Sequence, residues 1–173
     1  MYKIFFAFFI LFLPFNLFSQ KLSNGFKDFK LGMSKEQVSN LLKKSFDFDA
    51  KREEILSIRL EPDTEIITAD GMGFIQIGYF HFNKDKLFQI FLKIDEKKIG
   101  YYLLLKNNTE RFGNPKRLDP KSASWEDGEV LITIEKPCTI KYIYLPIWNE
   151  LIKKDQTTDN YEQKLRKDFV DTL

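Results

Sequence analysis

The residue types that most often catalyse reactions or bind metals are scarce in this 173-residue chain, which has one histidine, His81, and one cysteine, Cys138. A single cysteine cannot form an intramolecular disulfide or a cysteine-rich zinc site. A single histidine rules out the histidine pairs of many metal centres, and a hydrolase built on His81 would need a distant carboxylate. Cys138 is expected to be a small buried apolar residue. The sequence therefore predicts no catalytic residue, no metal site and no cofactor.

Charged and glycine-rich segments do not point to a specific ligand either. Segment 47–49 (DFD) lacks the glycine and the closing glutamate of a calcium-binding loop. Segment 71–73 (GMG) lacks the third glycine and the following helix of a dinucleotide-binding loop. The 27 Lys and Arg residues nearly balance the 25 Asp and Glu residues, so the net charge is only +2. This balance gives no basic field for nucleic acid, and it leaves binding by shape as the expected mode of action.

The first twenty residues have the layout of a secretory signal peptide. Lys3 precedes an apolar run over Ile4–Leu13, and Pro14 interrupts it before a more polar end at Ser19 and Gln20. The run is shorter than the roughly 20 residues that span a bilayer, although an uncleaved membrane anchor is the alternative. No later segment is long and apolar enough to cross a membrane. We therefore expect a bacterial periplasmic or secreted protein without disulfides, and not a lipoprotein, because no cysteine lies at the cleavage junction.

Periodicity in the mature chain predicts helices that alternate with hairpin-connected strands. A capping box at Ser34 and Gln37 begins a helix over residues 35–44. Segments 74–82 and 87–94 alternate in period two around a four-residue loop, and further strands follow at 130–134 and 138–145. A second helix is expected after Asp95. This order predicts an α+β fold with antiparallel sheet, because parallel strands would need a crossover at each step.

The domain organisation follows from the same pattern. Residues 21–155 are expected to form one domain whose halves, about 31–94 and 95–145, repeat the order of helix and strands. Residues 156–173 place Tyr161, Leu165 and Phe169 at four-residue intervals, which predicts an amphipathic C-terminal helix. That helix could pack on its own domain or dock on a partner.

Two segments resemble known envelope proteins. Gly32–Val38 (GMSKEQV) is similar to the opening helix of the SmpA/OmlA envelope lipoproteins, which assist outer-membrane β-barrel assembly. More broadly, that helix together with Phe112–Pro115 (FGNP) and the later Trp125 resembles the tandem units of the β-lactamase-inhibitor-protein-like group. The resemblance implies one or two helix-plus-antiparallel-sheet units, a protein-binding surface and no catalytic residue. Two departures are the missing lipid-anchored cysteine and the presence of two units where SmpA/OmlA proteins have one.

Alternation along the central strands predicts the candidate binding residues. If the helices cover one face of the sheet, the other carries an aromatic and polar mixture typical of protein contact surfaces: Tyr79, His81, Leu87, Gln89 and Phe91. We expect an exported, non-catalytic domain that binds an envelope or secreted protein there. The alternatives are that residues 146–173 cover this face, or that the domain carries a small apolar or lipid ligand between sheet and helices.

Overall fold

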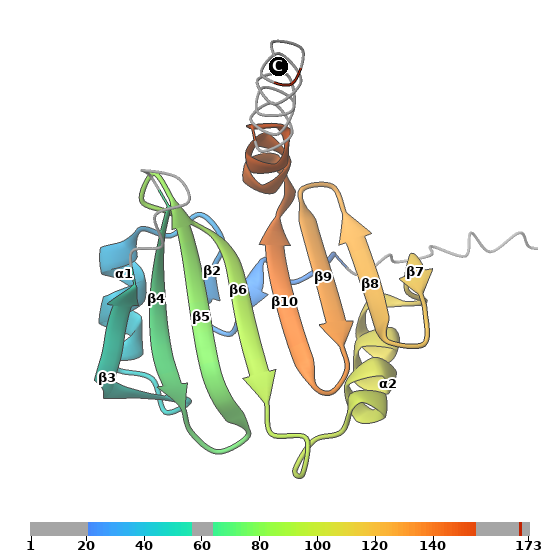
Figure 1. The fold of residues 1–173 in the computed structure, drawn as a ribbon. Helices are drawn as coiled ribbons and strands as arrows, with labels where there is room; N and C mark the ends of the chain where they lie inside the picture. The colour runs from blue at the N-terminus through green and yellow to red at the C-terminus, as the bar shows by residue number, and fades with distance from the viewer. Residues whose placement is uncertain (1–20, 57–63, 155–169, 171–173) are drawn as a thin grey trace, which may run out of the picture.

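The protein is an α+β structure built on one large antiparallel sheet (Figure 1). The computed structural model describes residues 21–56, 64–154 and 170. In chain order the elements are β1 (Gly25–Phe26), β2 (Phe29–Lys30), α1 (Lys35–Leu42), β3 (Phe48–Leu56), β4 (Thr64–Gly71), β5 (Ile75–Asn83), β6 (Lys86–Ile94), α2 (Tyr101–Phe112), β7 (Arg117–Leu118), β8 (Ser122–Asp127), β9 (Val130–Glu135) and β10 (Thr139–Tyr144). Residues 145–154 form a further helical stretch.

The topology of the large sheet confirms the expected tandem arrangement of helix and strands. The strand order is β3-β4-β5-β6-β10-β9-β8-β7, and every pair is antiparallel. Each half is a helix followed by a four-stranded meander. The second meander runs across the sheet in the reverse order, so the last strands of both halves, β6 and β10, pair at the centre. The two halves therefore share one continuous sheet.

The helix α1 begins where its sequence predicts. The Ser34 side chain accepts a hydrogen bond from the backbone N–H of Gln37 (3.2 Å), and the Gln37 side chain accepts one from the backbone N–H of Ser34 (2.9 Å). This reciprocal pair satisfies two of the N–H groups that a helix start leaves without partners. Val38 and Leu42 lie on the inner side of the helix and are fully buried.

The hydrophobic core lies between the sheet and the elements that cover one of its faces, namely α1, the β1–β2 hairpin and α2 (Figure 1). Rings from three strands meet there, with Phe48 5.6 Å from Phe29 and 5.5 Å from Phe80 between centroids. Gly78 makes room for this cluster, because a Cβ at that position would lie 2.6 Å from the Phe48 ring. Burial of these aromatic rings supplies much of the driving force for folding.

The second helix starts later than predicted. Asp95 caps a separate turn by accepting a hydrogen bond from the backbone N–H of Lys97 (3.1 Å), and α2 begins six residues on, after Gly100. The predicted end is confirmed, since Gly113 closes the helix with a φ of 80°. Its carbonyl accepts a hydrogen bond from the Trp125 indole N–H (2.8 Å), which ties α2 to β8.

The helical stretch 145–154 leaves the end of β10 and projects past the strand ends (Figure 1). The predicted signal peptide, residues 1–20, lies outside the described residues. So does the predicted amphipathic helix 156–173, apart from Val170. Among the residues that the structure describes, no helix is long and apolar enough to cross a membrane.

Candidate functional site

The face of the sheet opposite the helices carries most of the predicted binding residues, and we call it the open face. Tyr79 on β5 pairs with Phe91 on β6, and His81 pairs with Gln89. These four side chains therefore share one face, as predicted, and each is partly exposed. Helices α1 and α2 and the β1–β2 hairpin lie behind the sheet as Figure 1 shows it. No described element packs over the centre of this face.

The prediction for Leu87 is wrong. Leu87 pairs with Phe82 and is fully buried in the core on the helix side of the sheet. A β-bulge at Phe88 inserts one extra residue into β6, so the alternation of faces that holds from Gln89 onward is reversed at Leu87. Single-residue alternation cannot show a bulge, because a bulge is defined by two strands together. Phe88 lies beside His81 instead, with 6.2 Å between ring centroids.

An aromatic and charged cluster occupies the centre of the open face. Tyr79 and Phe91 meet edge to face, with centroids 5.4 Å apart and ring planes at 74°. The Lys141 ammonium lies 5.5 Å from the Phe91 centroid and forms a 2.7 Å ion pair with Glu135. Lys141 and Glu135 were not among the binding residues predicted from the sequence. Alternation alone could place Lys141 opposite Ile140 and Tyr142, but only the pairing of β10 with β6 brings it to Phe91.

His81 has an environment that keeps its imidazole neutral. Burial lowers the pKa of His81 to about 4, from an ordinary value near 6.5. Its cross-strand neighbours are Ile66 and Gln89, and the Phe88 ring lies against it. Within the described residues the imidazole forms no ion pair and no hydrogen bond to a carboxylate or hydroxyl group. Among the described residues, this geometry gives the histidine no partner for proton transfer.

Cys138 lies on the other side of the sheet from His81. Its thiol is buried and donates a hydrogen bond to the carbonyl of Ile99 (2.9 Å). Burial and the charge of Glu96 raise the pKa of this thiol, which keeps it protonated and unreactive. In the described part of the chain no three His, Cys, Asp or Glu side chains are close enough to hold a metal ion.

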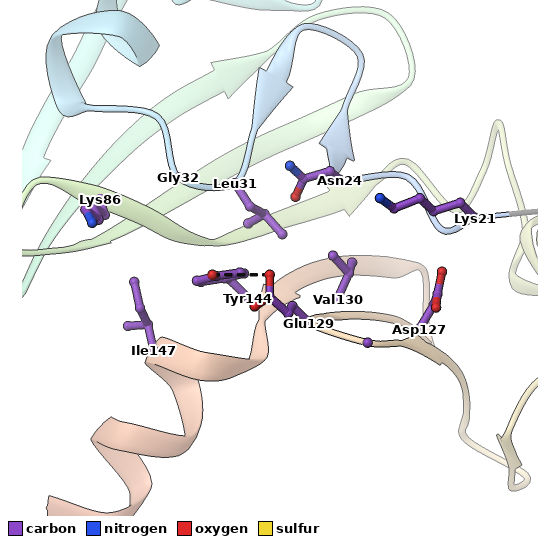
Figure 2. Close-up of a pocket in the computed structure, with 11 residues that line it drawn as sticks. Lys21, Asn24, Leu31, Gly32, Lys86, Asp127, Glu129, Val130, Tyr144 and Ile147 are labelled. Carbon is purple, nitrogen blue, oxygen red and sulfur yellow. Dashed lines mark hydrogen bonds between the residues drawn. The ribbon is translucent and has the colours of Figure 1, made fainter.

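A groove of about 610 Å³ opens on the helix side of the sheet, where the two halves meet (Figure 2). We call it the inter-half groove. One wall comes from the segments that flank the β1–β2 hairpin and from the start of β6, and the other from the β8–β9 turn, the end of β10 and the following helix. Its lining residues are Lys21, Asn24, Leu31, Gly32, Lys86, Asp127, Gly128, Glu129, Val130, Tyr144 and Ile147.

The middle of the groove joins a carboxylate to an apolar surface. The Tyr144 hydroxyl donates a hydrogen bond to Glu129 Oε2 at 3.4 Å, and Leu31 points toward this pair from the opposite wall (Figure 2). Burial and the Glu129 carboxylate raise the pKa of the Tyr144 hydroxyl, so it stays a hydrogen-bond donor. The groove could not be predicted from local sequence patterns, because its walls are up to 126 residues apart in the chain, from Lys21 to Ile147.

Comparison with known proteins places the whole described fold in one family. Residues 24–154 match the family model described as the TP0088 domain, and this span includes every strand and both labelled helices. No curated protein and no solved structure matches the chain. The resemblance to SmpA/OmlA and to β-lactamase-inhibitor-protein-like domains therefore stays a prediction.

Proposed function

This chain belongs to the TP0088 domain family, and we propose that it is an exported, non-catalytic domain of the bacterial envelope that recognises a protein partner through the open face. The observation that carries the proposal is the aromatic cluster of Tyr79 and Phe91, which is partly exposed at the centre of the sheet face that α1 and α2 do not cover. The signal-peptide pattern of residues 1–20 supports the location. The partner is then another envelope or secreted protein.

The size of the open face is adequate for a stable complex. Eight strands at about 4.8 Å spacing give a width of about 34 Å. The central strands have 6 to 9 residues, which corresponds to about 20–30 Å at about 3.3 Å per residue. The face thus offers roughly 700–1,000 Å², compared with about 800 Å² per partner in a standard interface.

The chemistry of the open face also resembles an interaction surface. Aromatic side chains concentrate binding energy when a surrounding polar rim excludes water from them, and here Lys141 and Glu135 flank Phe91. Because each of these residues lies on a paired strand, little conformational entropy is lost when a partner binds. The site fits a partner that inserts an apolar side chain against the Tyr79–Phe91 pair.

Affinity capture from envelope extract of the source cells tests this function. We expect the purified protein to recover one stoichiometric protein partner, and the double variant Tyr79→Ala/Phe91→Ala to lose it while still folding. Tyr102→Ala is the matched control, because Tyr102 is an equally large exposed aromatic residue on α2, away from the open face. Equal recovery of the partner by the double variant and the control would overturn the proposal.

The second candidate function is the carriage of a small apolar or lipid ligand, which the inter-half groove favours by its volume. About 610 Å³ lies within the roughly 300–1,000 Å³ of known ligand sites. Extraction of the purified protein with organic solvent, followed by mass spectrometry, tests this function. A stoichiometric lipid in the extract would support carriage, and its absence would count against it.

A further inference from the structure

We propose that the inter-half groove is a second, separate binding site, and that it takes a short extended peptide segment carrying a basic group beside an apolar side chain. This site lies on the helix side of the sheet, so it is independent of the open face. Four features of the groove support the proposal: charges on both walls that no described residue pairs, an apolar middle section, polar groups suited to a peptide backbone, and open space beside two glycines.

Within the part of the chain that the structure describes, the charged residues of the groove have no ionic partners. Lys21, Lys86, Asp127 and Glu129 line it, and none of the four forms an ion pair with another described residue. Other charges of the same sheet do pair. Lys116, for example, binds Glu126 on β8 at 2.8 Å. The groove thus holds charges that a ligand of opposite charge can neutralise.

The two carboxylates form the expected site for the basic group. Asp127 and Glu129 flank Gly128 at the β8–β9 turn, and both point up toward the opposite wall in Figure 2. Existing hydrogen bonds help to orient both, because Asp127 accepts one from the backbone N–H of Leu22 (3.4 Å) and Glu129 accepts one from Tyr144. A lysine, arginine or terminal amine between the two walls would form charge-assisted hydrogen bonds with them.

The middle of the groove offers an apolar surface next to that acidic site. Leu31 points down from one wall, and Val130 and Ile147 point up from the other (Figure 2). Leu31 is only 7% exposed, whereas Val130 and Ile147 are partly exposed and can still be covered. An apolar side chain placed between these three residues would remove their remaining surface from water, which favours binding.

The remaining polar groups suit a peptide better than a lipid. The Asn24 side chain offers both a donor and an acceptor, which matches the N–H and C=O of a peptide backbone. A Cβ at Gly32 or at Gly128 would meet no atom within 4 Å, so the space beside both backbones is open. A lipid tail has no group that could pair with the four charged side chains, whereas a peptide with charged side chains can pair with them.

Selection of random short peptides displayed on phage, with the purified protein as bait, tests the proposal. We expect enriched peptides to share a basic residue next to an apolar one. Their affinity should fall about tenfold or more in the double variant Asp127→Asn/Glu129→Gln, since a tenfold loss corresponds to about 1.4 kcal/mol. Glu110→Gln removes an exposed carboxylate on α2 and is the matched control, which should bind with unchanged affinity.

Two results would overturn this inference: selection that enriches no peptide, and enriched peptides that bind the double variant as tightly as the control. The two carboxylates that the double variant replaces, Asp127 and Glu129, are exposed, so the variant is expected to fold. The same peptides also distinguish binding in the inter-half groove from binding at the open face. Tyr79→Ala/Phe91→Ala should keep full peptide affinity, whereas a loss of affinity in that variant would move the peptide site to the open face.

Discussion

His81 should make the stability of this protein depend on pH in a way that a single substitution abolishes. Burial holds the pKa of the folded imidazole at about 4, whereas an unfolded chain has a histidine pKa of about 6.5. Between these values the unfolded state binds more protons than the folded state, so stability is full above pH 6.5 and falls as the pH drops toward 4. Among the described residues, the groups that face His81 are Ile66, Gln89 and Phe88, and these do not titrate.

The size of this effect follows from the two pKa values. Between pH 7.5 and pH 5.0, the proton-binding difference lowers the free energy of unfolding by about 2 kcal/mol. His81→Gln keeps a polar side chain of similar size but cannot titrate, so the variant should lack this component. Urea unfolding of both proteins at the two pH values measures the difference, and carboxylates shared by both proteins cancel in the comparison.

An NMR titration gives an independent measurement, because His81 is the single histidine of the chain and its imidazole signals are unambiguous. A measured pKa near or above 6.5 in the folded protein would refute the reasoning. So would a free energy of unfolding that falls equally in the wild type and in His81→Gln between pH 7.5 and pH 5.0. Either result would mean that water reaches the imidazole despite its burial against Phe88.

Three further predictions concern stability and can each be checked by urea unfolding. Leu87→Ala should lower the free energy of unfolding by about 2–5 kcal/mol, because it opens a cavity in the core. A decrease below about 1 kcal/mol would indicate that Leu87 lies on the open face and not in the core. Gly78→Ala should also be destabilising, because the new Cβ would lie 2.6 Å from the Phe48 ring, and unchanged stability would show that the ring can shift. Ser34→Ala should lower the free energy of unfolding by about 1 kcal/mol, because the Ser34 hydroxyl no longer accepts a hydrogen bond from the Gln37 backbone N–H. Ser34→Asp should retain most of this stability, because its carboxylate can accept the same hydrogen bond.

Local sequence patterns predicted much of the fold. The capping box at Ser34 located the start of α1, and alternation located β5, β6, β9 and β10. The sequence predicts a four-residue loop between β5 and β6, but the turn has only Lys84 and Asp85 between paired strands. Both residues have positive φ values, 48° and 60°, which a two-residue hairpin turn of this kind requires. Neither residue is a glycine, so the composition did not signal the tighter turn.

The candidate sites also contain some residues that local spacing could place and others that only strand pairing or packing could place. Tyr79, His81, Gln89 and Phe91 could be placed on one face from alternation alone, because successive side chains of a strand point to opposite faces. Leu87 could not, since the bulge at Phe88 exists only in the pairing of two strands. The groove could not be predicted at all, because its walls come from both ends of the domain.

The sequence by itself determined the scarcity of reactive groups, the start of α1, the strand alternation and the α+β class, because these depend on residue type and on spacings of a few residues. Only the tertiary structure decided that β6 pairs with β10, since nothing local specifies how two meanders join. That one pairing places Lys141 over Phe91 on the open face, and it brings Leu31 opposite Glu129 and Tyr144 in the inter-half groove. Contacts between distant segments arise from packing of the whole chain, and both proposed binding sites depend on such contacts.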